Sequence, residues 1–211
     1  LYDFGYPHAP IVDYSVGDVS DKALFDTGNS AWVALFTEVA EADSVQQEIR
    51  RDSIVTGTGF EGESAGGRGE AGTLTWFTLQ DFRLDRDTLG PVRATTRAVP
   101  PTLVGAGVLS SYVVTLDYPG EQFLLEARTE AAPAREEPGY SLALVGDAVE
   151  VVQLFEGSAP ATAGLQLGDQ VTAFSGRSLS VTGENPKCSI ARWLIDSFDA
   201  SQAADLSVVR D

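Results

Sequence analysis

The chain has 211 residues, which suffices for one large domain or two small ones. Hydrophobic residues make up 43% of it, the share of an ordinary globular protein with a buried core. Its 14 basic and 31 acidic residues give a formal net charge of −17 at pH 7, which argues against nucleic acid and anionic membranes as partners, because both bind basic patches.

The first part of the chain, residues 1–128, has the pattern of a β-rich domain. Residues 11–16 alternate apolar with polar side chains and end at the turn signal Gly17-Asp18. The apolar run 23–25 stops at Asp26. Further strand candidates, rich in β-branched and aromatic residues, are 74–79, 113–116 and 123–125. Short strands separated by turns predict a mainly β fold with a closed, barrel-like sheet.

A glycine-dense segment, residues 56–72, lies inside this region. Glycine adopts positive φ and has no side chain, so the segment is predicted to be a mobile hairpin or loop. The composition leaves two interpretations open, an unstructured surface loop and a functional flap over a binding site.

A charged, proline-containing stretch, residues 129–137, shows no periodic apolar pattern and is predicted to be an interdomain linker. Residues 138–211 follow as a small α+β domain. Within it, residues 149–152 have the pattern of a strand, 190–198 that of an amphipathic helix and 206–209 that of a final strand.

The most informative site is the sequence Leu24-Phe25-Asp26-Thr27-Gly28-Asn29-Ser30, in which an acid directly follows an apolar strand. Burying a carboxylate costs free energy unless hydrogen bonds compensate. Gly28 lets the chain turn sharply, so that its N–H approaches the carboxylate, and the Thr27 hydroxyl can hold the loop. The triplet alone also fits a plain tight turn in which Asp26 bonds its own backbone.

A second motif follows later in the chain, Leu103-Val104-Gly105, with a helix-capable stretch and the strand-like residues 112–118 behind it. With these motifs in this order, about the first 125 residues resemble the retropepsin-like aspartic peptidases of clan AA. The resemblance implies a closed β-barrel-like domain. It also places the glycine-dense segment where the family has its flap, with Gly57-Thr58-Gly59 as candidate substrate-binding residues.

The resemblance implies an endopeptidase that hydrolyses extended peptides, with Asp26 as the catalytic carboxylate and Thr27 and Gly28 supporting its loop. Two such carboxylates about 3 Å apart share one proton and activate a water molecule. The chain has no second Asp-Thr/Ser-Gly triplet. We therefore expect a homodimer in which each chain contributes one Asp26 across a two-fold axis. No cofactor and no metal is expected.

Two residues depart from the retroviral members of this family. Asn29 follows Gly28 where those members have Ala or Ser, and Ala106 stands where they have an Arg that pairs with an acid near the active site. The resemblance therefore leaves the dimer geometry open. A second hypothesis stands beside the first, a non-catalytic peptide-binding scaffold with a degenerate peptidase fold.

Residues 138–211 resemble a bacterial PDZ domain. The resemblance rests on Gly157-Ser158-Ala159-Pro160 and on Ala163-Gly164-Leu165-Gln166-Leu167-Gly168-Asp169, followed by an apolar strand and a glycine turn. It implies capture of a peptide by strand addition, with Gly139-Tyr140-Ser141-Leu142 as the candidate loop for a terminal carboxylate. The ligand is unknown. The alternative is a module that only rigidifies or dimerises the peptidase, and its short length for the family suggests truncation.

The sequence lacks the residues that a zinc site or a disulfide would require. His8 is the only histidine, Cys188 is the only cysteine and excludes an intrachain disulfide, and no zinc-binding motif is present. No apolar run reaches the ~18–20 residues of a membrane-spanning helix. Because the sequence begins at Leu1 and contains no methionine, we expect a fragment. Its localisation is unknown, and a periplasmic or secreted location is favoured if a signal peptide was removed.

Overall fold

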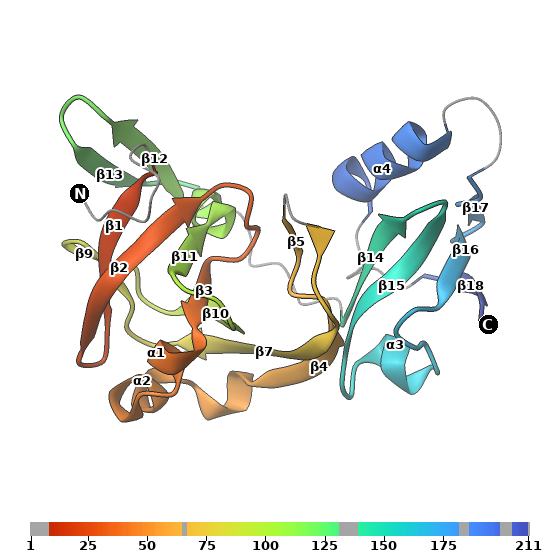
Figure 1. The fold of residues 1–211 in the computed structure, drawn as a ribbon, viewed down its shortest axis with the longest axis horizontal. Coiled ribbons are helices and arrows are strands. Elements are labelled where there is room, and N and C mark those ends of the chain that lie inside the picture. The colour runs from red at the N-terminus through yellow and green to blue at the C-terminus, as the bar shows by residue number, and fades with distance from the viewer. Residues whose placement is uncertain (1–8, 65–66, 131–138, 182–185, 199–203, 211) are drawn as a thin grey trace. The chain divides into compact units, whose positions relative to one another are not determined.

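The computed structural model describes residues 9–64, 67–130, 139–181, 186–198 and 204–210. Their secondary structure is mainly β, which confirms the coarse prediction of the fold class. Contacts divide the chain into two compact units, the first made of residues 1–55 and 75–133 and the second of residues 56–74 and 134–211 (Figure 1). No helix in the described ranges is long and apolar enough to span a membrane.

One sheet forms the frame of the first unit. Its strands are β1 (Ile11–Val16), β2 (Val19–Asp26), β3 (Val33–Phe36), β7 (Gly72–Leu79, which begins in the second unit), β8 (Arg83–Leu84), β9 (Asp87–Thr88), β10 (Val92–Arg97) and β11 (Thr102–Gly105). They are hydrogen-bonded in the order β7-β10-β3-β11-β2-β1-β8-β9. Two neighbouring pairs are parallel, β10 with β3 and β11 with β2.

Short helical turns and a hairpin complete the first unit. After β3 come α1 (Thr37–Ala40), α2 (Asp43–Glu48) and the 3-10 turn η1 (Arg51–Ser53), and after β11 come the 3-10 turn η2 (Ala106–Ser110), β12 (Tyr112–Asp117) and β13 (Gln122–Ala127). Strands β12 and β13 pair with each other in a separate two-stranded sheet. Among the described residues the strand order ends at β9 and continues beyond β7 to strands of the second unit, without returning to its start, so the closed barrel expected from the sequence is not found.

An apolar core fills the first unit. Alternate residues of β1 are buried, namely Val12, Tyr14 and Val16, as expected of a strand with one face turned inward. The Tyr14 hydroxyl lies 3.0 Å from the Thr102 Oγ1, and this same oxygen accepts a hydrogen bond from the Phe36 N–H at 3.1 Å. Burial raises the pKa of Tyr14. The shared hydroxyl contact ties β1, β3 and β11 together inside the core.

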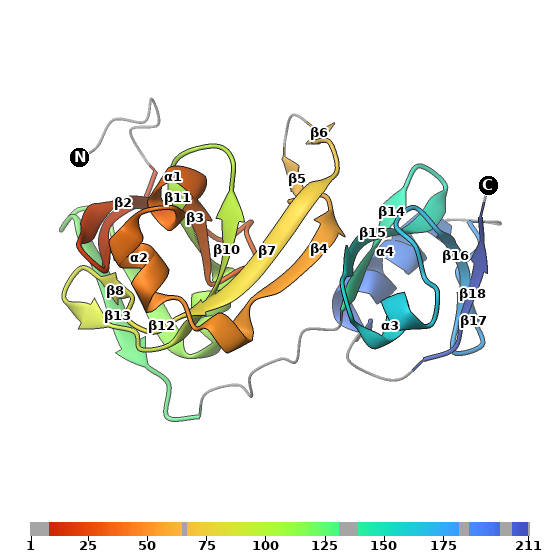
Figure 2. The same ribbon diagram turned by 90° about the horizontal axis from the view of Figure 1, so that it is seen from below.

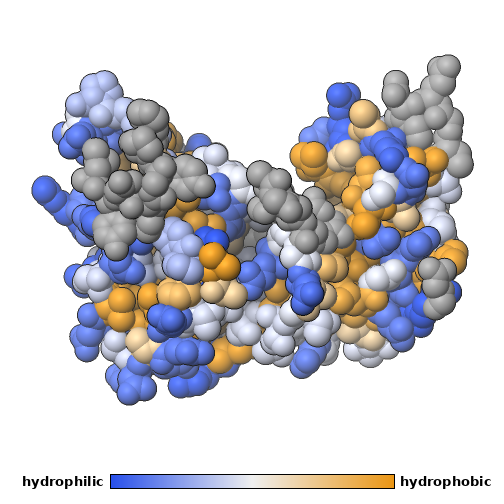
Figure 3. All heavy atoms as spheres, viewed as in Figure 1, coloured by the Kyte–Doolittle hydropathy of each residue, from blue (hydrophilic) through white to orange (hydrophobic). Residues whose placement is uncertain are grey.

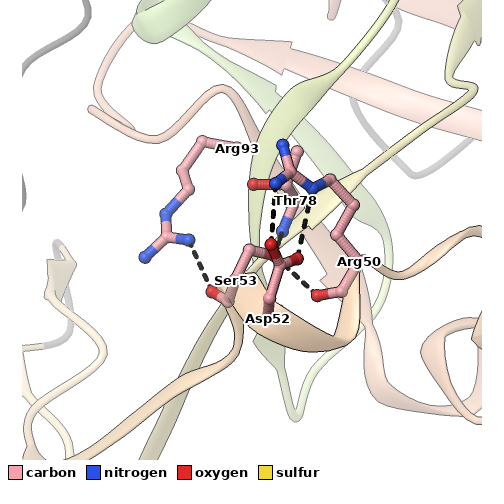
Figure 4. A network of polar contacts seen from close by, with 5 residues as sticks. All are labelled: Arg50, Asp52, Ser53, Thr78 and Arg93. Atoms are coloured by element: carbon pink, nitrogen blue, oxygen red, sulfur yellow. Dashed lines mark hydrogen bonds and ion pairs between the residues drawn. The ribbon is translucent and has the colours of Figure 1, made fainter.

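A polar network anchors η1 to the first unit just before the chain enters β4 (Val55–Gly59) (Figure 4). The Arg50 N–H donates to the Thr78 carbonyl at 2.9 Å, and the Thr78 N–H donates to the Ser53 Oγ at 2.8 Å. The Ser53 carbonyl accepts a hydrogen bond from the Arg93 guanidinium at 2.9 Å, and Arg50 forms a surface ion pair with Asp52. These bonds fix the starting point of the glycine-dense segment.

The second unit combines that segment with the C-terminal part of the chain. Its strands and helices are β4, β5 (Glu63–Ser64), β6 (Gly67–Arg68), β14 (Tyr140–Val145), β15 (Ala148–Phe155), α3 (Ala159–Thr162), β16 (Gln170–Phe174), β17 (Arg177–Ser178), α4 (Pro186–Asp196) and β18 (Leu206–Val209). These strands follow the order β17-β16-β15-β4, after which the strand order continues to β7, with β14 also paired to β15 and β18 to β16. Helix α4 packs on β14 (Figure 2), and Ile190 of α4 is buried in the same apolar cluster as Tyr140 of β14.

The grouping of the glycine-dense segment differs from the sequence-based division. That division places all of residues 1–128 in one domain, whereas the contacts group residues 56–74 with the C-terminal part, because β4 is hydrogen-bonded to β15. Most of the linker 129–137 lies outside the described residues. The segment is a strand where it meets β15, so of the two interpretations left open the unstructured loop does not hold for residues 56–59.

Candidate functional site

Asp26 is the last residue of β2, and its side chain is half-buried. Its Oδ1 accepts a hydrogen bond from the Gly28 N–H at 2.9 Å, and its carbonyl accepts one from the Asn29 N–H at 3.1 Å. The Asn29 Oδ1 then accepts the Ala31 N–H at 2.8 Å. The chain therefore turns sharply around the carboxylate, and the approach of the Gly28 N–H to it is as expected from the sequence.

The second sequence motif lies directly beside this turn. Strand β11 runs parallel to β2 with Gly105 opposite Asp26. Beyond the strand, the Ala106 N–H donates to the Asn29 carbonyl at 2.7 Å, and the Gly107 N–H donates to the Ala31 carbonyl at 3.2 Å. Residues 103–105 and the Asp26 loop (residues 26–31) are about 80 positions apart in the sequence. They thus form one hydrogen-bonded structure.

Glycine is required at the contact between these two loops. A Cβ on Gly105 would lie 2.2 Å from the Ala31 carbonyl oxygen and 2.5 Å from that of Asn29, both of which are backbone atoms. The two residues before it, Leu103 and Val104, are buried in the core. The pattern of two apolar residues and a glycine is therefore explained locally, since the apolar residues anchor β11 and the glycine admits the Asp26 loop.

The sequence predicts that the Thr27 hydroxyl holds the loop, whereas the structure gives this role to Asn29. Thr27 is exposed, and its hydroxyl makes no hydrogen bond to any residue in the part of the chain described here. Asn29, noted in the sequence only as a departure from the family pattern, holds the loop through both its side-chain oxygen and its carbonyl. The sequence signal that could have revealed this is the Asx-turn tendency of an Asn directly after a glycine.

No second charged group joins Asp26 within the described residues. Among them no ion pair involves Asp26, and no cluster of His, Cys, Asp and Glu could hold a metal ion. His8 lies outside the described residues.

The three candidate flap residues, Gly57, Thr58 and Gly59, belong to the second unit. They pair with Phe155, Leu154 and Gln153 of β15, respectively. A Cβ on Gly57 would lie 2.5 Å from the Leu154 carbonyl oxygen, and one on Gly59 would lie 2.4 Å from that of Val152. Gly57 and Gly59, which in the sequence indicate a mobile hairpin or loop, are therefore needed for the close approach of β4 to β15.

The candidate carboxylate loop of the C-terminal module begins at Gly139, whose φ of 79° favours glycine. Tyr140 is only 4% exposed and belongs to the core. Ser141 and Leu142 are half-buried on β14. Among the described strands β14 pairs only with β15, so its other edge is open beside α4.

Apolar side chains of β14 and α4 pack against the module core. Leu142 and Leu144 of β14 and Trp193 and Leu194 of α4 are partly buried against the module core, and Ile195 is 81% exposed. Figure 3 shows apolar residues gathered on this part of the second unit. An open strand edge beside an apolar helix face is suited to binding an extended peptide by strand addition.

Asp169, the last residue of the module motif, has a structural role. It is 2% exposed, and its two carboxylate oxygens accept hydrogen bonds from the Arg210 guanidinium at 2.6 and 2.7 Å. Hydrogen bonding to Arg210 lowers the pKa of Asp169. Arg210 also donates to the Gly164 carbonyl at 3.0 Å, so it joins the end of β18 to both ends of the Gly164–Asp169 motif.

Comparison of the chain with protein-family models, with curated proteins and with solved structures found no match.

Proposed function

We propose that the chain is an aspartic endopeptidase with Asp26 as its catalytic carboxylate, a retropepsin-like first unit and a PDZ-like peptide-binding module. The observation that supports this most directly is the pairing of β2 with β11, which sets Gly105 opposite Asp26 and locks both loops together. The carboxylate is oriented by one backbone hydrogen bond to Oδ1, while Oδ2 accepts none from a described residue. Such a fixed, half-buried acid is suited to proton transfer.

The chemistry needs a second carboxylate. Two like charges at about 3 Å cannot both ionise, so a pair of Asp26 residues from two chains shares one proton. The ionised member removes a proton from water as the oxygen attacks the peptide carbonyl, and the protonated member donates to the carbonyl oxygen. The resulting tetrahedral intermediate then collapses as the C–N bond breaks and the amine takes up a proton.

The test is cleavage of an unbiased peptide library by the wild-type chain, by Asp26→Asn and by Asp18→Asn. We expect Asp26→Asn to lose at least about 100-fold in rate, because it removes acid–base catalysis from both halves of the pair. Asp18 is exposed in the turn between β1 and β2, so Asp18→Asn is a matched control that keeps the wild-type rate. Cleavage by Asp26→Asn at the wild-type rate would exclude Asp26 as the catalytic group.

The second candidate function is a non-catalytic peptide-binding scaffold. It is supported by the open edge of β14 beside α4, which is suited to peptide capture whether or not Asp26 is active. Light scattering at micromolar concentration separates the two functions. A strict monomer without cleavage favours the scaffold, because one chain supplies only one Asp26 loop.

A further inference from the structure

The glycine-dense strand β4 is held on β15 by more than the ladder of three residue pairs. Beyond the end of β4 the Phe60 N–H donates to the Val152 carbonyl at 3.1 Å, and at its other end the Glu156 N–H donates to the Thr56 carbonyl at 2.8 Å. The Thr56 hydroxyl also donates to the Glu156 carboxylate at 3.1 Å. The hairpin that starts with β4 and leads through β5 and β6 into β7 (residues 56–74, hereafter the hairpin) is therefore held at both ends of the seam between β4 and β15.

One side chain in this seam reaches both the hairpin and β14. The Gln153 Nε2 donates to the Phe60 carbonyl at 2.7 Å, while its Oε1 accepts a hydrogen bond from the Ser141 hydroxyl at 2.9 Å. Gln153 is half-buried, so these bonds are partly shielded from water. The amide uses its donor on one side and its acceptor on the other, and a single rotamer satisfies both.

An irregularity in the sheet lies at the same place. The β14–β15 register shifts between Ser141 and Leu142, so that Ser141 faces Gln153, Leu142 faces Val151, and Val152 has no partner on β14. The Val152 carbonyl is the one that accepts the Phe60 N–H. Bulges of this kind redirect individual groups of a strand, and here both the unmatched residue and its neighbour contact Phe60.

We propose that Gln153 is a positioning residue that couples the peptide-binding strand β14 to the hairpin, so that occupancy of β14 regulates how firmly the hairpin is held. A strand added to β14 further restrains Ser141, the Ser141 hydroxyl selects the Gln153 rotamer, and the Gln153 amide holds the Phe60 carbonyl. The coupling is reciprocal, because a docked hairpin favours peptide binding by the same free energy. The proposal rests on the proposed function only where it treats the hairpin as the flap of the peptidase and β14 as the peptide-binding strand.

Amide hydrogen exchange of the full chain tests the coupling without any need for catalysis. The readout is the Phe60 N–H, compared among wild type, Ser141→Ala, Gln153→Ala and the double variant. We expect each single variant to exchange about five-fold faster, the ratio that corresponds to losing one net hydrogen bond. The double variant should match Gln153→Ala, because Ser141 acts only through Gln153.

Two further variants separate coupling from a general loosening of the module. Ser141→Thr keeps a hydroxyl and should restore the wild-type exchange rate at Phe60. Ser207→Ala removes an exposed hydroxyl on β18 of the same unit and should leave that rate unchanged.

A wild-type exchange rate in Ser141→Ala, or an added effect in the double variant, would overturn the proposal. If the wild-type chain cleaves no peptide, only the proposed peptidase function fails, because the hydrogen-exchange measurement does not depend on cleavage.

Discussion

The Asp26 loop and the seam between β4 and β15 lie in different units, yet glycine has the same purpose in both. In the first, Gly105 allows β11 to approach the carbonyl groups of Ala31 and Asn29. In the second, Gly57 and Gly59 allow β4 to approach the carbonyl groups of β15. Close packing of backbone on backbone, rather than mobility, explains glycine at all three positions.

The two regions differ in how they can respond to a larger side chain. Gly105 sits between buried Val104 and a loop held by several backbone hydrogen bonds, so a clash there must move the core of the first unit. Strand β4 lies between β15 and β7 in the strand order and contributes no side chain to the apolar cluster of the module, so it can separate from β15 while that cluster stays intact. The same substitution should therefore unfold one region and only release the other.

The largest effect is expected for Gly105→Ala. The added Cβ would meet two backbone oxygens at 2.2 and 2.5 Å, and neither can move without breaking the loop. We expect the first unit to lose at least about 3 kcal/mol of stability, at the upper end of what overpacking costs. Denaturant unfolding measures this loss, and an unchanged midpoint would show that the two loops are not packed as described.

A smaller and local effect is expected for Gly59→Ala. Its φ of 154° disfavours any other residue, and its Cβ would lie 2.4 Å from the Val152 carbonyl oxygen. We expect about 2 kcal/mol less protection of the hairpin amides in hydrogen exchange, with the module core unaffected.

Gly72→Ala is the matched control for Gly59→Ala, because a Cβ there meets nothing within 4 Å. Equal loss of protection in Gly72→Ala would mean that the segment needs glycine for mobility, which would break the parallel with Gly105.

The strands were predictable from the sequence because their signals are local. The alternation in residues 11–16 and the β-branched runs near 74–79 and 206–209 give β1, β7 and β18. The helix expected at 190–198 is shifted toward the N-terminus, at Pro186–Asp196. The open sheet and the pairing of β4 with β15, nearly 100 residues away, were not predictable, because such partners are chosen by tertiary packing.

The candidate site shows the same difference between local features, which the sequence predicts, and long-range contacts, which it does not. Asp26 at the end of a strand and the turn at Gly28 follow from a short motif. The Asn29 side-chain contact with the Ala31 N–H is also local. The contact of the Asn29 carbonyl with the Ala106 N–H, and that of Arg210 with a buried carboxylate more than 40 positions earlier, join distant parts of the chain, so neither could be deduced from neighbours in the sequence.

The smallest expected effect is the loss of stability of the second unit at low pH. It compares one polar contact of each unit. The first unit contains the Tyr14–Thr102 contact, which does not titrate in acid, whereas the second contains the Asp169–Arg210 pair. Because the pKa of Asp169 is lower in the folded chain than in the unfolded chain, the pair stabilises the second unit above the ordinary carboxyl range. That stabilisation should be lost as the pH falls below about 4 and through the lowered pKa.

Fluorescence of Trp193 follows the second unit by itself when Trp32 and Trp76 are replaced by Phe, since these three are the only tryptophans. In that background we expect the thermal midpoint to drop by a few degrees in acid. Asp169→Asn should lower the midpoint at pH 7, because the neutral amide pairs less well with Arg210, and should flatten its dependence on pH. The effect stays modest because the Arg210 side chain is 45% exposed and water solvates it when the pair breaks. An equally steep acid response in Asp169→Asn would assign the acid sensitivity to other carboxylates of this strongly acidic chain.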